Sequence, residues 1–187
     1  MMATTHVFAG LGVAVPIALL APEFAPVVAT AAIVGGLFPD LDVVASHRKT
    51  LHYPVYYTML AVPATLLAVI APSATTAGFA VFVIAAALHS VADQFGGGLA
   101  VKPWHGESKR AVYSHYHGRW LPPQRWIGYD GSPGDLAIAA LLALPLLFVF
   151  DGAIRALVIA MLVVSIGYTV FRKLVGDGTE RLVSRLS

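Results

Sequence analysis

The stretch from Gly35 to Pro54 concentrates side chains that could do chemistry in an otherwise apolar chain. It holds two carboxylates, Asp40 and Asp42, and two imidazoles, His47 and His52. Carboxylate oxygens and imidazole nitrogens are ligands that zinc and similar divalent metals take in proteins. In an extended or turning segment alternate residues point the same way, so both carboxylates could face one ion. We interpret the segment as half of a metal site rather than as an ordinary helix-end turn, where proline and aspartate are also common.

A second pair, His89 and Asp93, would supply the other half of this site. The two residues are four apart on a predicted helix, so they share one face and can grip one ion, or the aspartate can orient the imidazole. The alternative is a hydrogen-bonded pair at a polar helix end, but ionisable groups among membrane helices are costly and mark functional sites. On the same ground we include His6, at the start of the first predicted helix. The predicted ligands are His6, Asp40, Asp42, His47, His52, His89 and Asp93.

The composition places this cluster in an integral membrane protein. The chain has 187 residues, 58% hydrophobic and only 12% charged, with a mean hydropathy of +0.77, whereas soluble domains are about 25% charged. The chain has no cysteine, which excludes disulfides and thiolate metal sites. The length fits a single membrane domain over residues 1–187. The net charge of +2 is small, and we expect no nucleic-acid partner.

Six apolar runs predict the elements that position the cluster. Several runs are shorter than the roughly 20 residues that span a bilayer, but flanking aromatic residues or a thin bilayer would accommodate them. We therefore expect an all-α, polytopic membrane bundle of about six transmembrane helices. The runs cover residues 7–21, 24–38, 55–71, 75–92, 136–150 and 153–171.

The basic residues predict the orientation of this bundle. Lysines and arginines occur after the second and fourth predicted helices and in the tail, and are absent from the other three connections. The positive-inside rule then places both termini in the cytoplasm, in a multi-pass protein of the cell's inner membrane, with Arg155 as the lone exception. All seven histidines fall on the cytoplasmic side, which favours a shared site over scattered filler. The chain start lacks a basic n-region, which argues against a cleaved signal peptide.

Two further segments are expected at the cytoplasmic surface. Residues 94–135 alternate in part and are predicted to form a short hairpin or an irregular cap. His115 and His117 could be ligands there, but the tryptophans of this segment favour an interfacial lid over a second metal site. The basic, amphipathic tail of residues 172–187 should lie along the inner leaflet or extend the sixth helix.

The order of these motifs resembles that of a known family. The chain resembles the YdjM-like inner-membrane proteins, predicted membrane-bound metal-dependent hydrolases, over about residues 5–98. That family is distantly similar to zinc-dependent phospholipase C and P1-type nucleases, all-helical enzymes that cleave phosphoesters with zinc bound by His and Asp. Leu51 and Tyr53 stand where the family usually has threonine and serine. The matching motifs are Thr5-His6, Pro39-Asp40-Leu41-Asp42, His47-Arg48, His52, and His89 to Asp93.

Metal-assisted hydrolysis is the reaction that we expect from this ligand set and this resemblance. A bound divalent ion, Zn²⁺ above all, would lower the pKa of a water toward about 7. The predicted ligands outnumber those of a mononuclear site, so either two ions bind or one or two residues act as a base. Asp42, His52 and Arg48 are the predicted catalytic residues. The forked donors of Arg48 suit a phosphate oxygen; the alternative is that Arg48 is a plain positive-inside residue. The expected substrate is a phosphoester or a phospholipid headgroup at the cytoplasmic face, with membrane lipids as partners.

Three other functions compete with hydrolysis. The first is a scaffold whose metal site is structural. The second is a transporter, which usually binds its substrate near the bilayer midplane, whereas the middles of these helices hold few polar residues. The third is a haem protein, but carboxylates beside the histidines are unlike an apolar haem pocket.

Overall fold

The structure, a computed structural model, describes residues 1–186 and confirms the predicted helical bundle. Four segments are long and apolar enough to cross a membrane: Ala3–Leu20, Pro22–Val44, Ala74–Phe95 and Gly152–Leu182. The helices α3 and α5 are apolar but shorter, with 17 residues each. Over the described residues the α-helices are α1 (Ala3–Leu20), α2 (Ala25–Leu37), α3 (Pro54–Ile70), α4 (Ala74–Ala92), α5 (Pro133–Val149) and α6 (Gly152–Leu186).

Proline and serine define where several helices begin. Pro54 and Pro133 occupy the first turns of α3 and α5, where the missing N–H of proline costs no hydrogen bond. Ser73 caps α4 in a capping box with Thr76, and the hydroxyl of Ser132 accepts the backbone N–H of Asp135 at the start of α5. These local signals explain why the observed helix starts lie close to those expected from the apolar runs.

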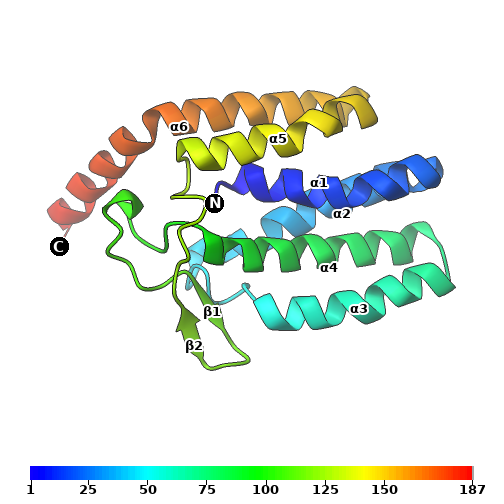
Figure 1. The fold of residues 1–187 in the computed structure, drawn as a ribbon, viewed down its shortest axis with the longest axis horizontal. Helices are drawn as coiled ribbons and strands as arrows, with labels where there is room; N and C mark the ends of the chain where they lie inside the picture. The colour runs from blue at the N-terminus through cyan, green and yellow to red at the C-terminus, as the bar shows by residue number, and fades with distance from the viewer. Residues whose placement is uncertain (187) are drawn as a thin grey trace.

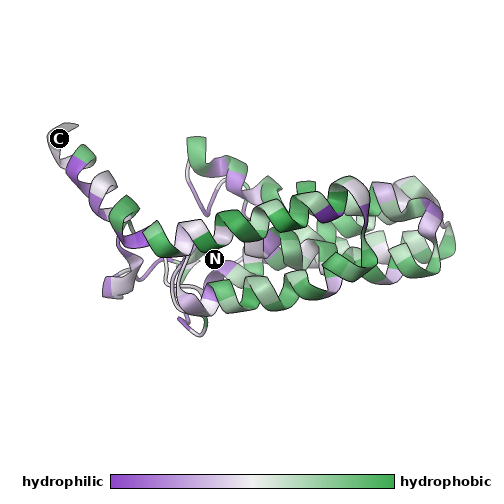
Figure 2. Ribbon diagram, turned by 90° about the horizontal axis from the view of Figure 1, so that it is seen from above, coloured by the Kyte–Doolittle hydropathy of each residue, from purple (hydrophilic) through white to green (hydrophobic). Residues whose placement is uncertain are grey.

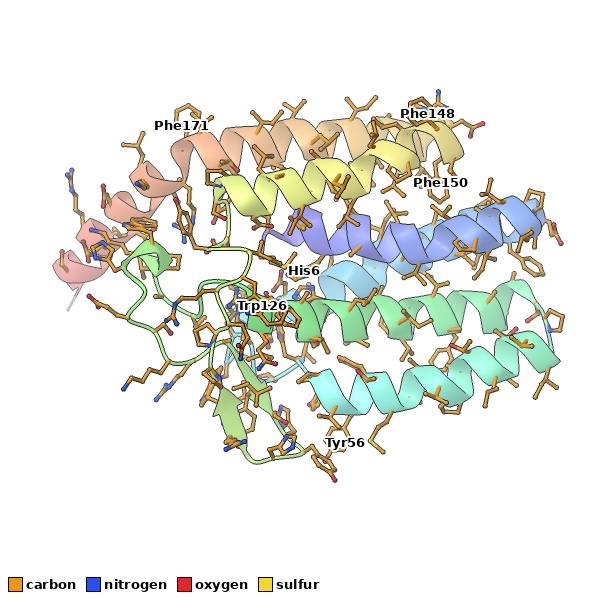
Figure 3. The ribbon with its side chains drawn as sticks, in the orientation of Figure 1. His6, Tyr56, Trp126, Phe148, Phe150 and Phe171 are labelled. Atoms are coloured by element: carbon orange, nitrogen blue, oxygen red, sulfur yellow. The ribbon has the colours of Figure 1, made fainter. Side chains whose placement is uncertain are left out.

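The connections divide the bundle into two ends (Figure 1). Short turns join α1 to α2, α3 to α4 and α5 to α6 at one end. Both termini and the longer connections lie at the other, which we call the loop end. Hydrophilic residues gather toward the loop end, whereas the helices are mostly hydrophobic (Figure 2). His6 lies at the loop end, and Phe148 and Phe150 lie at the opposite end (Figure 3). The predicted alternation of connections between two ends is therefore present, and which end faces the cytoplasm stays a prediction.

The core of the bundle forms where α1, α2, α4, α5 and α6 meet. Phe8, Leu11, Val28, Val81 and Leu146 are fully buried there. In a membrane, such helix contacts are stabilised by van der Waals packing rather than by removal of apolar surface from water. Outward-facing positions of the same helices are apolar and exposed, as expected for a surface that lies in lipid.

Two glycines let α2 approach its neighbours closely enough to build a site between them. A Cβ on Gly36 would lie 3.0 Å from Cα of Val7 in α1, and a Cβ on Gly35 would overlap the carbonyl oxygen of Phe82 in α4. Small residues are the usual means of close helix contact in membranes. The loop ends of α1, α2 and α4 are therefore drawn together.

The connections at the loop end contain short ordered elements. The 3-10 helix η2 (Phe38–Val44) follows α2, and η3 (Asp93–Phe95) follows α4. The expected hairpin is present as β1 (Val112–Ser114) and β2 (Arg119–Leu121), an antiparallel pair. Two more 3-10 helices are η1 (Pro22–Phe24) and η4 (Pro103–His105).

The tail continues α6 rather than lying apart from it. Of the two arrangements expected for residues 172–187, the structure shows the helical extension, as far as Leu186; residue 187 lies outside the described residues. Arg172 binds Asp130 through a hydrogen bond from Nε to Oδ2 of 3.0 Å. Lys102 forms an ion pair with Asp177 at 2.9 Å. Its hydrogen bond to Glu180, and then that to Asp177, raise the pKa of Lys102.

Candidate metal centre

Four predicted ligands converge at the loop end of the bundle. Asp40 lies in η2, His52 in the connection before α3, and His89 and Asp93 at the end of α4. One ligand atom of each lies within 4.8 Å of every other. Nε2 of His52 is 3.3 Å from Oδ2 of Asp93 and 3.9 Å from Oδ1 of Asp40. Nε2 of His89 is 3.8 Å and 3.3 Å from the same two oxygens.

These spacings fit the coordination shell of one divalent ion. Ligands bound to zinc at about 2.0–2.1 Å in a tetrahedron lie roughly 3.4 Å from one another. The four separations above, from 3.3 to 3.9 Å, lie close to that edge length. The group could therefore hold a metal ion, although the geometry does not identify which one.

The deepest atoms of the group lack hydrogen-bond partners. Nε2 of His52, Nε2 of His89 and Oδ2 of Asp93 are buried, and none has a hydrogen-bond partner within the described residues. A buried polar atom left unsatisfied costs about 1–3 kcal/mol. Three such atoms facing one point are explained together if a cation binds there.

Hydrogen bonds on the outer side aim both imidazoles at this point. Nδ1 of His52 donates to Oδ2 of Asp42 at 2.9 Å, and Nδ1 of His89 donates to the carbonyl of Gly36 at 2.6 Å. Carbonyl and carboxylate oxygens only accept, so this assigns the proton to Nδ1 and leaves the lone pair on Nε2. Metal-ligating histidines are usually fixed in this way.

Asp42 organises the connection that carries His52. Its Oδ1 also accepts a hydrogen bond from Nδ1 of His47 at 2.9 Å. The structure thus places Asp42 and His47, both predicted ligands, outside the four-residue group. Asp42 contacts the group through its hydrogen bond to His52, and the side chain of His47 is about a third exposed (32%). The carboxylate also accepts the backbone N–H groups of Arg48, Lys49 and Leu51.

His6 borders the cluster from α1. Its Nε2 lies 3.2 Å from Oδ1 of Asp93, and its ring stacks on that of His89 with 3.7 Å between centroids. The α-amino group of Met1 lies 3.0 Å from the same oxygen. Asp93 therefore turns Oδ1 toward the start of α1 and Oδ2 toward the cluster, so His6 supports a ligand from behind.

Arg48 brings a positive charge to the same point. Its side chain is more than nine-tenths buried, and Nε lies 3.2 Å from Oδ2 of Asp93. The contact is an ion pair without a directed hydrogen bond, since Nε and Nη1 have no hydrogen-bond partner within the described residues. The backbone φ of Arg48 is 61°, a left-handed conformation that costs a non-glycine residue about 1–2 kcal/mol. A strained, buried arginine with free N–H groups suits an anion bound beside a metal.

The segment after α4 packs against the connection that carries His52. The backbone N–H of Tyr113 in β1 donates to the carbonyl of Arg48 at 2.9 Å. His115 lies 2.6 Å from the carbonyl of Lys49 through Nε2 and stacks on Tyr53 with 4.5 Å between centroids. These contacts place His115 in a supporting role, as a lid would require.

The charges around His52 set its affinity for a proton. Burial lowers the pKa of this imidazole, but the neighbouring carboxylates of Asp93 and Asp42 outweigh that effect and leave the pKa raised. A proton at Nε2 therefore competes with a metal for the same lone pair.

The sequence did not reveal the role of the Gly36 carbonyl. Its hydrogen bond to His89 depends on the close approach of α2 and α4, which no residue pattern states directly. The adjacent glycines Gly35 and Gly36, just before Pro39-Asp40, are the one signal that could have indicated a close helix contact beside the ligands.

Comparisons of this chain with models of protein families, with curated proteins and with solved structures found no match. Support for the site therefore comes from the geometry of its own residues. The two strongest observations are the matching separations among the four ligand atoms and the three buried atoms that lack partners.

Proposed function

We propose that the protein is a membrane-bound, metal-dependent hydrolase of the YdjM-like kind that acts on a phosphoester. Asp40, His52, His89 and Asp93 would hold one divalent ion, with zinc the best match to two imidazoles and two carboxylates. The observation that carries the proposal is the convergence of three buried, unpartnered ligand atoms on one point.

The exposure of the four ligands indicates where the substrate would approach. The side chains of His52, His89 and Asp93 are 0–1% exposed, whereas that of Asp40 is 30% exposed. When bound, the ion would polarise a phosphoryl oxygen and activate a water. The free N–H groups of Arg48 would bind the anionic phosphoryl oxygens, as arginine does with its forked donors.

The proposed reaction consumes one water. The water oxygen forms a bond to phosphorus as the bond from phosphorus to the leaving alcohol oxygen breaks. One proton of the water passes to the carboxylate of Asp40, the ligand whose side chain is the most exposed, and the other stays on the new phosphate hydroxyl. Asp40 then gives its proton to the alcohol oxygen as that oxygen leaves. Asp42 and the Gly36 carbonyl position the two imidazoles throughout and do not touch the substrate.

We also propose that all six helices cross the membrane, with the loop end in the cytoplasm. At 1.5 Å per residue, the 17 residues of α3 and of α5 extend about 26 Å, close to the thickness of a thin bilayer core. The arginines and lysines of the connections after α2 and α4 support a cytoplasmic loop end.

Metal content and hydrolysis, measured on the same preparation, test this proposal. Purified protein should hold close to one equivalent of zinc by elemental analysis and should hydrolyse members of a phosphoester panel. His89→Ala and Asp93→Ala should lose both the metal and the activity, whereas Asp151→Asn, an exposed change at the opposite end of the bundle, should lose neither. Absence of stoichiometric metal, or its retention in both alanine variants, would refute the proposal.

A structural metal site is the competing function, and the near-complete burial of three ligands favours it. The two functions differ in what metal removal does. A hydrolase loaded with zinc turns over an ester, and that turnover disappears with chelator and returns with zinc. A structural site shows a lower unfolding temperature with chelator and no turnover of any ester at any zinc concentration.

A further inference from the structure

We propose that the substrate is a phosphate-bearing membrane lipid that reaches the metal centre from the side, with an acyl chain in the groove between α2 and α4. This inference rests on the proposed hydrolase function and adds the substrate class and its route. Three features support it: a lipid-facing groove, its direction toward the ligands, and the apolar surroundings of the one exposed ligand.

A groove of about 680 Å³ runs between α2 and α4. Its walls include Val27, Val34 and Phe79, which are all exposed on the outside of the bundle. Both helices belong to segments apolar and long enough to cross a membrane, so the groove would open to lipid. Gly78 lets Val27 of α2 pack closely against α4 beside this groove, because a Cβ there would lie 2.9 Å from Cγ1 of Val27. An apolar cleft of this size can take a hydrocarbon chain.

The groove points toward the metal centre. It ends at Val34 and Phe82, and the ring of Phe82 meets that of Phe38 with 5.4 Å between centroids. His89 lies seven residues beyond Phe82 on α4, about 10 Å along the helix axis. Oδ1 of Asp40 is 3.3 Å from Nε2 of that histidine. An extended lipid covers this distance with its glycerol backbone and the first carbons of an acyl chain.

The exposed side of the cluster is apolar. Asp40 is followed in η2 by Leu41, which is 60% exposed, and Val44, which is 91% exposed. Exposed apolar side chains beside a polar mouth are typical of a surface that meets lipid. The hairpin meanwhile binds the backbone of Arg48 and Lys49, in the connection that carries His52. A substrate dissolved in the bilayer would meet the apolar side of the cluster first.

Arg48 is the reason that we expect the lipid to carry a phosphate group. Its guanidinium is buried beside Asp93 with two N–H-bearing nitrogens unpartnered, which an uncharged lipid headgroup would leave unsatisfied. A phosphate oxygen would accept from them while the acyl chain occupies the groove. Binding of this remote chain can raise kcat/KM for the lipid above that for its bare headgroup.

Matched pairs of esters and of variants test this inference. The zinc-loaded protein in detergent micelles is given phosphatidic acid or glycerol 3-phosphate, and phosphatidylglycerol or glycerophosphoglycerol; within each pair only the acyl chains differ. We expect kcat/KM for one of the two lipids to exceed that for its soluble partner at least about tenfold. Val34→Trp narrows the groove, and Val163→Trp makes the same change on an exposed face of α6.

Val34→Trp should lower kcat/KM for the lipid about tenfold and leave zinc content and turnover of the soluble partner within about twofold of wild type. Val163→Trp should change none of these. Equal kcat/KM for lipid and soluble partner overturns the inference and leaves the hydrolase intact. The inference is also overturned, and the hydrolase left intact, if Val34→Trp lowers kcat/KM equally for lipid and soluble partner. The same holds if the two tryptophan variants lower kcat/KM for the lipid equally. If wild type hydrolyses neither pair but turns over another member of the phosphoester panel, this inference fails and the hydrolase stands; if it turns over no phosphoester, both fail.

Discussion

Asp42 accepts a 2.9 Å hydrogen bond from Nδ1 of His52 and thereby holds the opposite nitrogen of that imidazole toward the metal centre. The same carboxylate also accepts hydrogen bonds from the backbone N–H groups of Arg48 and Lys49, in the connection that carries His52. Asp42→Asn keeps the size of the side chain but removes its charge. We expect zinc affinity to fall about 10–100-fold, the usual effect of losing such a supporting partner. Competition with a chromogenic chelator measures the change.

The control for Asp42→Asn is a variant that removes a ligand. His52→Ala should abolish stoichiometric zinc binding, because it deletes one of the four converging atoms. If Asp42→Asn lost zinc as completely as His52→Ala does, Asp42 would itself be a ligand. Wild-type affinity in Asp42→Asn would mean that its hydrogen bond to His52 has no supporting function.

We expect a change of Arg48 to lower catalysis without lowering zinc binding. Arg48→Gln should keep the zinc, since Arg48 contributes no ligand atom, but should lower kcat by about 10²–10³-fold through loss of a buried donor to the developing charge. Zinc content and turnover of a soluble phosphoester, measured together, check this prediction.

Arg48→Gly tests the backbone at the same position. The left-handed φ of 61° is one that glycine adopts without strain, so this variant should fold at least as well as Arg48→Gln while being equally inactive. Full activity in either variant would show that Arg48 is only a positive-inside residue.

The helical fold and most of the cluster could be predicted from the sequence because each depends on local patterns. Apolar runs indicate helices, and the spacing of His89 and Asp93 by four residues places them on one face. The distinction between ligand and support could not be predicted. Asp40 and Asp42 are two residues apart and chemically identical, and only the fold of η2 and of the connection after it brings Asp40 to Nε2 of His89 and Asp42 to Nδ1 of His52.

The role of α6 shows a second limit of the sequence. Hydropathy falls after Phe171, which indicates the end of a membrane span but does not tell whether the helix itself ends there. The helix continues because Arg172 is held by Asp130, from the connection before α5. A contact between residues this far apart in the chain leaves no periodic signal.

Zinc binding should weaken as the pH falls. The pKa of His52 is raised above its ordinary value of 6.5, so a proton occupies Nε2 at a higher pH than in a free imidazole and must leave before the metal binds. Zinc affinity should therefore begin to fall above pH 6.5 on acidification. A titration of zinc affinity from pH 8 to pH 5.5, with its midpoint compared to that of a model imidazole, measures the effect.

The stability of the metal-free protein should depend on pH in the opposite direction, falling as the pH rises. A raised pKa means that protonated His52 contributes stability that is fully present below about pH 6.5 and lost as the pH rises through the raised value. Unfolding of chelator-treated protein should thus become easier across that window, whereas zinc-loaded protein should become harder to unfold. Identical pH profiles for the two forms would contradict the proposed competition between proton and metal.

His115 and His117 differ in position and should differ in effect. Nε2 of His115 lies 2.6 Å from the carbonyl of Lys49, and its ring stacks on Tyr53, so it joins the lid to the connection that carries His52. His117 is exposed and bonds only its neighbour Ser114 among the described residues, at 2.8 Å.

His115→Ala should lower the free energy of unfolding by about 1 kcal/mol, the value of one hydrogen bond, and weaken zinc affinity through the less ordered connection. His117→Ala is the matched control and should change neither quantity measurably. Because both histidines lie outside the four-residue group, zinc stoichiometry by elemental analysis should stay at the wild-type value in both variants. A loss of half the zinc in either variant would instead reveal a second ion bound at the hairpin, and the lid would then be part of the metal site.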